Sequence, residues 1–337
     1  MLTLGVIGVE HRHIYGQLAG MLAIGCRCKG WWTDGEPQPV AGFCRRFPTV
    51  PRFDDRRRIL DDPDIDLVLI ADVPVRRADR AIEAMAAGKD VMTDKPGCTS
   101  VRQLAELRRT VGETGRIWSV DFSERFEVPA VTRALELIRQ GAIGRVVQTV
   151  GLGPHRLNRE TRPGWFFRED QTGGILCDIG SHQIDQFLVF TGSRTAEIVA
   201  ATVGNFANPE DPGLQDFGEI LIRGDGGSGY VRVDWYTPDA LPNWGDGRLT
   251  VLGTEGYIEL RKYVDVAGRP GTDHLFIVNG ERCDHEDAGN ADLPYFRNLA
   301  CDVRDRTETA MPQDHCFRVF ELALEAQRIA TRLGHGG

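Results

Sequence analysis

The first 121 residues alternate short apolar segments with amphipathic segments of helical period, and this alternation limits the possible folds more than any other feature. Asp66–Ala71 is apolar on both faces, as expected for a central strand of a parallel sheet that is covered on both sides. Six parallel strands are expected, and five of them can be given ranges: Leu2–Ile7, Cys28–Thr33, Asp66–Ala71, Val91–Met92 as the fifth and Ile117–Val120 as the sixth. The expected helices are Ile14–Ala23, Arg77–Ala87 and Val101–Gly112. Strands that alternate with helices in this way predict a doubly wound α/β domain.

The second half of the chain shows a different pattern, in which runs of strands are joined by glycine-rich turns such as Gly224–Gly227. Such runs indicate a mostly antiparallel sheet. The expected strands are Val146–Val150, Ile198–Val203, Phe217–Ile222, Tyr230–Tyr236, Leu249–Leu252 and Tyr257–Leu260, and the expected helices are Pro129–Arg139, Ser181–Phe190 and Asp314–Leu333. We therefore expect an N-terminal α/β domain over residues 1–122. An α+β C-terminal domain with a large, mostly antiparallel open sheet is expected over residues 123–337, with the last helix packing near the N-terminal domain.

Charge and composition exclude several classes of protein. The formal net charge is -9, whereas a nucleic-acid-binding protein needs a basic face, so no nucleic-acid partner is expected. No apolar run approaches the ~20 residues of a membrane-spanning helix, and the N-terminal residues show no secretion signal, so no membrane contact is expected. The eight cysteines are scattered and form no Cys-x-x-Cys pair, which favours reduced thiols and a cytoplasmic protein.

The turn after the first expected strand carries a degenerate glycine motif. A Rossmann dinucleotide fingerprint reads Gly-x-Gly-x-x-Gly, and its glycines allow a tight turn and close approach of the backbone to a pyrophosphate. Only Gly8 remains here, because Glu10 and His13 occupy the two other positions. Basic side chains at the helix start, His11, Arg12 and His13, can supply donors instead. We therefore expect the loop at residues 9–13 to bind a dinucleotide; the alternative is that it no longer binds one.

A metal site at the His-x-His pair of this loop is disfavoured. No third ligand is apparent nearby in the sequence, and two solvent-facing histidines are common. We therefore expect no metal.

The end of the second expected strand bears on the choice of cofactor. An acidic residue at this place normally binds the adenosine ribose hydroxyls, and a nearby Arg would accommodate a 2′-phosphate. Thr33 or Asp34 falls at the required distance, and no Arg follows directly. The sequence therefore favours NAD, with NADP as the alternative, although Asp34 is also well suited to be a turn residue before Gly35.

Several segments, in the expected order along the chain, resemble those of the Gfo/Idh/MocA oxidoreductase family. The most specific contains Asp94-Lys95-Pro96, which is similar to the family's Glu-Lys-Pro signature with Asp94 in place of Glu. The others resemble the family's crossover region, its substrate-site motif and a late turn. In chain order the segments are Gly88–Pro96, Val120–Phe126 with Gly141–Gly144, Gly173–Asp185 and Gly253–Gly256.

The resemblance implies an NAD(P)-dependent oxidoreductase that transfers a hydride between nicotinamide and a secondary alcohol of a sugar, cyclic polyol or derivative. It places Lys95, which we expect to follow the fifth strand of a six-stranded parallel sheet, between nicotinamide and substrate. Asp178 and His182 would lie in the substrate site, with His182 as proton acceptor. The family's Thr-Pro stretch and later His read Asp72-Val73-Pro74 and Arg77 here. The expected cofactor-binding residues are Gly8, Val9, Glu10, His11, Arg12, His13, Thr33, Asp34, Ala71, Asp72, Asp94 and Lys95.

Lys95, Asp178 and His182 suit the oxidation of an alcohol. This reaction needs a base for the hydroxyl proton while a hydride is transferred to nicotinamide. Asp178 and His182 are four residues apart, so at a helix start they share one face. Asp178 can orient the imidazole or bind a sugar hydroxyl, His182 titrates near neutrality, and Lys95 can polarise the reacting oxygen. The structural alternatives are a helix N-cap for Asp178 and a core histidine for His182. We expect all three residues to converge on one pocket.

Aromatic and basic residues near these motifs are candidates for substrate contact, because rings stack on sugar C–H faces and Arg binds hydroxyl or carboxylate groups. Phe166 and Phe167 are expected in the core. The segments Asp234–Pro238 and Trp244–Arg248 are expected to form either a wall of the site or a subunit contact. An open sheet leaves one face to be covered, which predicts a homo-oligomer, either a dimer or a tetramer. The expected substrate-binding residues are Lys95, His155, Trp165, Arg168, Asp178 and His182.

Two other functions stay open. Some members of the family use bound NAD transiently to cleave glycosides, and net redox with added NAD would separate that activity from a dehydrogenase. A non-catalytic ligand-binding protein is suggested by the degenerate glycine loop, while the presence of Lys95, Asp178 and His182 argues against it.

Overall fold

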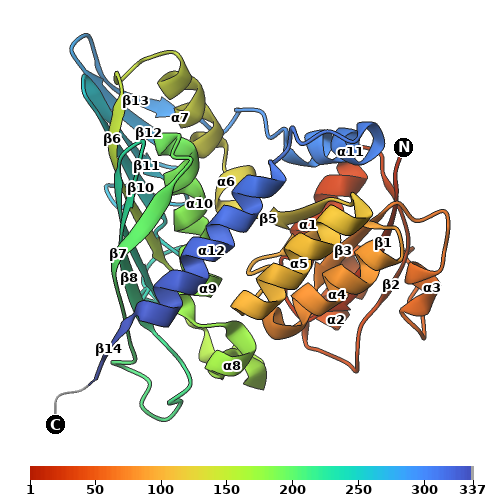
Figure 1. Cartoon of the computed structure of the whole chain (residues 1–337). Helices are drawn as coiled ribbons and strands as arrows, with labels where there is room; N and C mark the ends of the chain where they lie inside the picture. The colour runs from red at the N-terminus through yellow and green to blue at the C-terminus, as the bar shows by residue number, and fades with distance from the viewer. Residues whose placement is uncertain (335–337) are drawn as a thin grey trace. The chain divides into compact units, whose positions relative to one another are not determined.

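The computed structural model describes residues 1–334, which form two compact units. Unit 1 comprises residues 1–121, 163–173 and 294–321, and unit 2 comprises residues 122–162, 174–293 and the chain from residue 322 onward. The expected fold class is confirmed, because unit 1 contains a parallel sheet between helices and unit 2 a large, mostly antiparallel sheet (Figure 1).

Unit 1 is built on a parallel sheet of five strands in the order β2-β1-β3-β4-β5. The strands are β1 (Thr3–Val9), β2 (Arg27–Trp32), β3 (Leu67–Ala71), β4 (Asp90–Asp94) and β5 (Trp118–Asp121). The prediction of six strands is wrong, because the chain between β2 and β3 adds only an isolated parallel bridge between Trp31 and Arg52. Lys95 therefore follows the fourth strand of this sheet.

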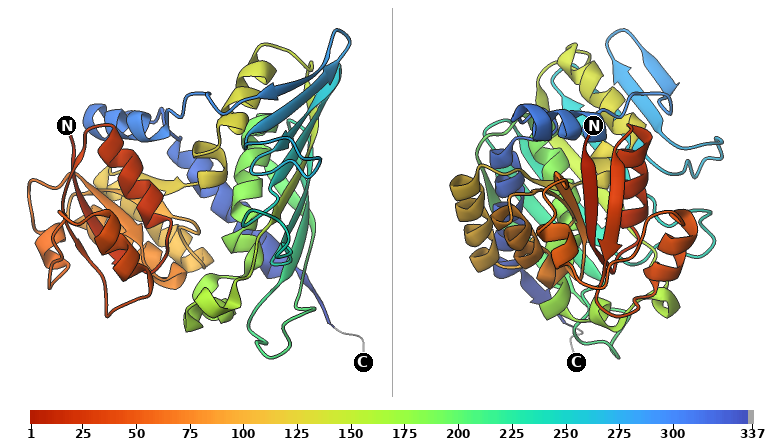
Figure 2. Two further views of the ribbon diagram at one scale, coloured as in Figure 1. Left: turned by 180° about the vertical axis from the view of Figure 1, so that it is seen from behind. Right: turned by 90° about the vertical axis from the view of Figure 1, so that its right-hand side faces the viewer.

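Helices cover both faces of this sheet, with α1 and α2 on one face and α4 and α5 on the other (Figures 1 and 2). Pro74 opens α4, where its fixed φ suits the first helical turn, and Gly88 follows its end with φ of 81°. Ser100 caps α5 by accepting a hydrogen bond from the backbone N–H of Gln103 at 3.2 Å. The helices of unit 1 are α1 (Ile14–Ala23), α2 (Pro39–Arg46), α3 (Arg57–Leu60), α4 (Pro74–Ala86), α5 (Val101–Thr114), η2 (Gly164–Phe167), α8 (Glu169–Thr172) and α11 (Tyr295–Asp305).

Unit 2 contains a nine-stranded sheet in the order β13-β12-β11-β10-β6-β9-β8-β7-β14. Neighbouring strands are antiparallel except for the pairs β6–β9 and β14–β7, which are parallel. The hairpin β12–β13 extends the sheet beyond the predicted strands. The strands are β6 (Val146–Pro154), β7 (Ala196–Gly204), β8 (Phe217–Gly224), β9 (Ser228–Asp234), β10 (Arg248–Gly253), β11 (Gly256–Arg261), β12 (His274–Asn279), β13 (Cys283–Asp287) and β14 (Thr331–Leu333).

The helices of unit 2 lie on one face of this sheet, and the opposite face carries no helix among residues 1–334 (Figure 2). Buried side chains of α7, such as Val131 and Leu137, belong to one apolar core with Leu249, Ile258 and Ile277 of the strands. The helices are α6 (Ser123–Phe126), α7 (Pro129–Arg139), η1 (Arg159–Thr161), α9 (Ile175–Asp178) and α10 (Gly180–Thr191).

The final helix, α12 (Gln313–Ile329), ends earlier than predicted. Residues Thr331–Leu333 form β14 instead, because their backbone pairs with Thr202–Gly204 of β7. An edge strand offers unpaired N–H and C=O groups, and this pairing overrides the helical periodicity that precedes it. None of the helices within residues 1–334 combines the length and the apolar character needed to cross a bilayer.

Candidate functional site

The turn after β1 is held against the end of β3 by a close backbone approach. Gly8 has φ of 83°, and a Cβ atom at this position would lie 2.5 Å from the backbone nitrogen of Asp72. The backbone N–H of Glu10 donates to the carbonyl of Ala71 at 2.9 Å, and the N–H of Val9 donates to the Thr33 hydroxyl at 3.0 Å. The structure thus brings these predicted cofactor residues together at the carboxyl edge of the sheet.

The first amides of α1 lie directly after this turn. Among residues 1–334, the backbone N–H groups of Arg12 and His13 have no hydrogen-bond acceptor, so both can donate to an anion at the helix start. Glu10 is half-buried and accepts a hydrogen bond from Trp165 Nε1 at 3.3 Å. Burial raises the pKa of Glu10, which reduces the negative charge that this side chain would set against a pyrophosphate.

Asp34 lies just beyond the end of β2. Its carboxylate is 70% exposed and lies 3.8 Å from the guanidinium of Arg76, which is in the first turn of α4. An exposed pair at this distance holds neither partner firmly. Asp34 is therefore free to turn toward a ribose, and Arg76 is close enough to meet a 2′-phosphate, so the arrangement accommodates NAD or NADP.

A cluster of two imidazoles and one carboxylate links the β1 turn to the end of β4. Asp94 is fully buried, and its two oxygens lie 2.9 Å from His11 Nδ1 and 2.8 Å from His13 Nδ1. Burial and the neighbouring His13 lower the pKa of His11 to about 3, so its imidazole is neutral at neutral pH. Burial would raise the pKa of Asp94, but Arg77 and both histidines hold it well below the usual range. The sequence argument that no third ligand lies near the histidines is wrong, because the fold brings Asp94 to them from 81 residues away.

Arg77 fixes the segment that carries Lys95. Its guanidinium is fully buried and lies 2.9 Å from Asp94, while its Nε donates to the Asp72 carbonyl at 2.8 Å. The same side chain donates to the backbone carbonyls of Lys95 and Pro96. Arg77 thereby joins the ends of β3 and β4 through one planar group. Lys95 itself is 4% exposed.

In unit 2, the predicted pair Asp178 and His182 does not share one helix. Asp178 is the last residue of α9, and His182 lies in the first turn of the separate helix α10. The break falls at Ile179, which is the N-cap residue of α10, so the N-cap interpretation of Asp178 is wrong. Asp178 is half-buried, whereas His182 is 1% exposed and its ring packs edge-on to Phe122 with 6.2 Å between centroids.

A buried ion pair lies beside α10. The carboxylate of Glu124 accepts hydrogen bonds from Lys262 Nζ at 2.9 Å and Gln183 Nε2 at 2.8 Å, both on Oε2. Burial would raise the pKa of Glu124, but Lys262, His182 and His155 together lower it well below its usual range. The second oxygen, Oε1, is buried and has no hydrogen-bond partner within the described part of the chain. Glu124 is therefore a fixed negative charge in the surroundings of His182.

His155 follows β6 and sits among aromatic rings. Its Nδ1 lies 3.1 Å from the carbonyl of Gly153, and its ring centroid lies 5.3 Å from Trp235 and 4.6 Å from Trp244. Trp244 in turn packs on Tyr263 at 4.6 Å and is 40% exposed. The two polar-aromatic segments of the sequence thus meet around His155.

The remaining substrate candidates lie in unit 1. Arg168 is exposed, and its guanidinium pairs with the adjacent Asp170 at 2.7 Å. Trp165 is half-buried and donates to Glu10. Phe166 is buried as expected, whereas Phe167 is only half-buried.

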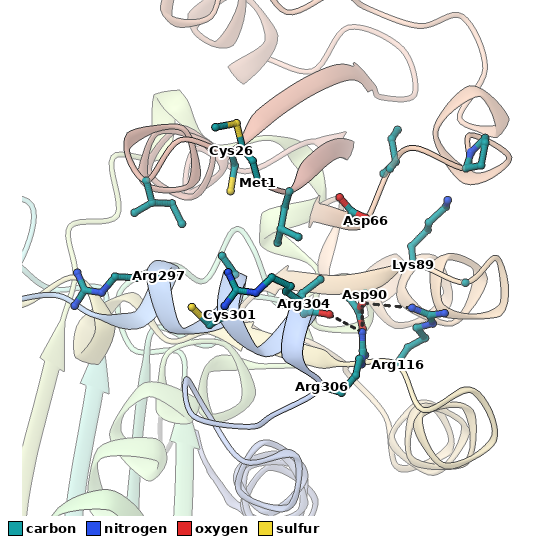
Figure 3. Close-up of a pocket in the computed structure, with 17 residues that line it drawn as sticks. Met1, Cys26, Asp66, Lys89, Asp90, Arg116, Arg297, Cys301, Arg304 and Arg306 are labelled. Carbon is teal, nitrogen blue, oxygen red and sulfur yellow. Dashed lines mark hydrogen bonds and ion pairs between the residues drawn. The ribbon is translucent and has the colours of Figure 1, made fainter.

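A cavity of about 720 Å³ in unit 1 lies at the opposite edge of the parallel sheet (Figure 3). Its lining includes Leu2 before β1, Asp90 at the start of β4 and Arg116 before β5. Figure 3 shows Arg306 and Arg116 both directed at Asp90, with the closest Arg306 contact at 2.6 Å. Ligands of doubly wound sheets bind beyond the carboxyl ends of the strands, so this cavity at the amino ends is not the dinucleotide site.

Sequence reasoning missed three residues of the buried pair and its surroundings: Glu124, Gln183 and Lys262. Glu124 and Gln183 lie inside two segments that resemble the family, Val120–Phe126 and Gly173–Asp185, but neither residue was assigned a role. Lys262 offers one signal, since only four of the 40 basic residues are lysines and this one is fully buried.

Known proteins match the chain over both units. The oxidoreductase family with an NAD-binding Rossmann fold matches residues 34–122, and the GFO/IDH/MocA C-terminal domain matches residues 131–259. Levoglucosan dehydrogenase of Pseudarthrobacter phenanthrenivorans is 30% identical over 204 residues, which are 60% of this chain and 52% of that protein. The chain thus spans about half the length of this relative. The scyllo-inositol 2-dehydrogenase (NAD(+)) of Bacillus subtilis is 28% identical over 296 residues, 85% of this chain and 81% of that protein.

A solved structure extends the match to the whole chain. A candidate oxidoreductase from Erwinia carotovora atroseptica SCRI1043 is 43% identical, with a TM-score of 0.96 over 99% of this chain and 100% of that chain. Together with the fold, these matches place the protein among the oxidoreductases that carry an NAD-binding Rossmann domain. Within that class the chain belongs to the Gfo/Idh/MocA family, so the resemblance found in the sequence is confirmed.

Proposed function

We propose that this protein is an NAD(P)-dependent oxidoreductase that transfers a hydride between nicotinamide and a secondary alcohol of a sugar or cyclic polyol. The observation that carries the proposal is the position of Lys95, buried directly after β4 at the carboxyl edge of the Rossmann sheet. Ligands of such sheets bind at that edge. The two named relatives, which act on levoglucosan and scyllo-inositol, support a sugar or polyol as substrate class.

The residues of the β1 turn fit a dinucleotide. Gly8 permits the close approach of β1 to β3, and the backbone N–H groups of Arg12 and His13 at the start of α1 can donate to phosphate oxygens. Glu10, the departure that opposes a pyrophosphate, is tied to Trp165. We therefore assign the pyrophosphate to residues 9–13 and the adenosine ribose to Asp34.

The bound cofactor supplies the hydride acceptor or donor, and the chain supplies the proton chemistry. We assign His182 as the base that takes the hydroxyl proton at its imidazole, and Lys95 as the cation that polarises the reacting oxygen. Glu124 supplies an ionised carboxylate that interacts electrostatically with His182. Asp178 is assigned to a substrate hydroxyl.

The kinetic test compares three single variants with the parent protein. His182→Ala removes the base and should lower kcat by ~10²–10⁴, and Lys95→Ala should do comparable harm, while the Kd for NAD changes little. His285→Ala is the matched control. His285 is an exposed histidine on β13, so its substitution should leave kcat unchanged. NADH formation with a panel of inositols and anhydrosugars is followed by absorbance. The proposal would be overturned if calorimetry detected no heat of binding for NAD, NADH, NADP or NADPH at millimolar concentration.

The same assay separates the two alternatives. A glycoside-cleaving enzyme that uses NAD only transiently would release sugar without net NADH, and a binding protein would show heat with sugar but no turnover. Net NADH formation that depends on His182 supports the dehydrogenase.

We also propose that the chain works as a homo-oligomer in the cytoplasm. Along the strands of the nine-stranded sheet, exposed apolar side chains alternate with side chains buried on the opposite face, and none of the eight cysteines forms a disulfide within residues 1–334. Light scattering at micromolar concentration should give at least twice the mass of one chain, and Leu221→Lys on that face should lower it. Val266→Lys, in the loop after β11, is the control. The apolar side chains are Val147, Val199, Leu221, Leu252 and Tyr257.

A further inference from the structure

The cluster of His11, His13 and Asp94 has the composition of a metal site. Two imidazoles and one carboxylate are the protein ligands of several catalytic zinc and non-haem iron sites, which leave further coordination positions open. The three ligand atoms all lie within 4.8 Å of one another. Within residues 1–334 this is the one group of three such side chains that the fold gathers so closely.

The distances between these atoms are close to those between neighbouring ligands of one ion. His11 Nδ1 and His13 Nδ1 lie 2.9 Å and 2.8 Å from the Asp94 oxygens. Two donors that each lie about 2.1 Å from one tetrahedral ion are separated by roughly 3.4 Å, so the ligand atoms need to move apart by only about 0.5 Å. The two imidazole rings are nearly perpendicular, at 87° with 4.3 Å between centroids, so both fit side by side around a common point.

A simple His–Asp hydrogen-bond network explains only part of this geometry. The His13–Asp94 contact is aligned as a hydrogen bond. The His11–Asp94 contact does not have hydrogen-bond geometry, and His11 Nδ1 is buried without a hydrogen-bond partner among the described residues, whereas Asp94 Oδ2 forms an ion pair with Arg77 at 2.9 Å. An unpaired buried polar atom is costly, so His11 Nδ1 indicates that a further group, such as a bound ion, satisfies it.

The surroundings permit an ion to enter and stay. The side chains of His11 and His13 are 24% and 36% exposed, whereas Asp94 is fully buried. Arg77 lies 2.9 Å from Asp94 Oδ2, the same oxygen that faces His11, and this ion pair fixes the carboxylate in place. A carboxylate has about four acceptor sites on its two oxygens, so it can bind Arg77 and a metal together.

We propose that His11, His13 and Asp94 bind one divalent cation of the zinc or cobalt class at the carboxyl edge of the parallel sheet. Imidazole ligands favour such ions over Mg²⁺ and Ca²⁺, which take oxygen ligands. With three protein ligands the ion keeps open positions for water or an oxygen of a bound ligand. The site does not depend on the proposed function, because its three ligand side chains all belong to the chain itself.

The test measures binding of Co²⁺ and Zn²⁺ to the full chain after removal of metal with a chelator and alkylation of exposed thiols. Equilibrium dialysis without nucleotide should give one ion per chain, and Co²⁺ should show the visible absorption of an ion with nitrogen ligands. His13→Gln should lower the affinity by at least about 100-fold. His285→Gln is the matched control, because it removes the histidine that contacts His274 at 3.0 Å in a pair without this geometry.

Two results would overturn the proposal: no Co²⁺ or Zn²⁺ bound at millimolar concentration, or equal affinity in the parent protein and the double variant His11→Gln/His13→Gln. Circular dichroism establishes that the variants are folded, and the single variant His13→Gln, at a partly exposed position, serves if the double variant is not. Dinucleotide calorimetry on the same metal-free samples keeps the outcomes separate. If calorimetry detects NAD binding but no metal binds, only the proposed metal site is contradicted. If metal binds but calorimetry detects no nucleotide binding, only the proposed function is contradicted.

Discussion

At the scale of single residues, Arg77 is the side chain whose loss should matter most to unit 1. Its guanidinium is fully buried and bonded to Asp94 and to three backbone carbonyls. Arg77→Met leaves the buried Asp94 carboxylate without its strongest cation, which should cost about 3–5 kcal/mol in the free energy of unfolding. Urea denaturation measures this loss.

Its neighbour provides the control. Among the described residues the side chain of Arg76 makes only ion pairs at 3.8 Å, and it is 44% exposed, so Arg76→Met should change the same free energy by less than about 1 kcal/mol. Equal effects of the two substitutions would show that the Arg77 contacts contribute no more than a surface pair.

Glu124 should make the stability of unit 2 depend on pH. Its pKa in the folded protein is held well below the usual value, so its contribution is fully present above the unfolded-state pKa of about 4.3 and is lost as the pH falls below it. Glu124→Gln leaves Lys262 buried and unpaired, and at pH 7 it should cost about 3–5 kcal/mol.

The measurement is urea unfolding of the parent and Glu124→Gln proteins at pH 7, 5 and 3.5. The difference between them should be constant from pH 7 to 5 and smaller at pH 3.5. The double variant Glu124→Gln/Lys262→Met removes both charges and should recover part of the loss. A difference that grows toward low pH would contradict the assigned ionisation.

Single residues also show where sequence reasoning stops. His11 and His13 could be picked out because they stand at a recognisable helix start, but nothing local indicates that Asp94 meets them. Only the parallel pairing of β1, β3 and β4 brings these positions to one edge. Lys262 lies between Arg261 and Tyr263 in an ordinary strand end, so its pairing with Glu124 across 138 residues has no local pattern to reveal it.

At the scale of elements, the turn after β1 depends on a missing side chain. Gly8 and Gly88 have nearly the same φ, 83° and 81°, but a Cβ atom at Gly8 would meet Asp72 at 2.5 Å, whereas nothing lies within 4 Å of one at Gly88. Gly88→Ala should cost only the backbone strain of ~1 kcal/mol. Gly8→Ala adds a clash with backbone and should cost at least ~2 kcal/mol more.

Thermal melting of the two alanine variants measures this contrast. Calorimetric titration with NAD should also separate them, because only the Gly8 substitution displaces the turn to which we assign the pyrophosphate. Equal melting temperatures would show that β1 and β3 can move apart without loss.

The elements that could be predicted are those with a clear period and a clear end. β3 is apolar throughout, and α5 lies between a Ser cap and a left-handed glycine, so both are confirmed. The hairpin β12–β13 was missed because β13 reads Cys-Asp-His-Glu-Asp, with almost no apolar residue to give it a period. The separation of α9 from α10 was also missed, since the sequence Cys177–Ser181 has no proline to mark a break.

At the scale of the whole molecule, the division into units follows contacts rather than chain order. Residues 163–173 and 294–321 belong with the N-terminal 121 residues. Trp118 shows why, because its ring packs on Phe317 and Phe320 at 5.4 Å and 5.7 Å. Nothing in the local sequence indicates that a distant segment packs back on the N-terminal residues. The class of each sheet, in contrast, follows from local periodicity and was predicted.

The two borders of the nine-stranded sheet are protected in different ways. β13 ends one side with charged residues that repel a further strand, whereas the apolar strand β7 is shielded at the other side only by the three residues of β14. Removing β14 would convert β7 into a template on which other chains can polymerise. A protein that stops after Ala330 should form thioflavin-positive aggregates on mild heating, while one that stops after Gly334 should stay in solution. Equal aggregation of both proteins would show that β14 does not protect the edge of β7.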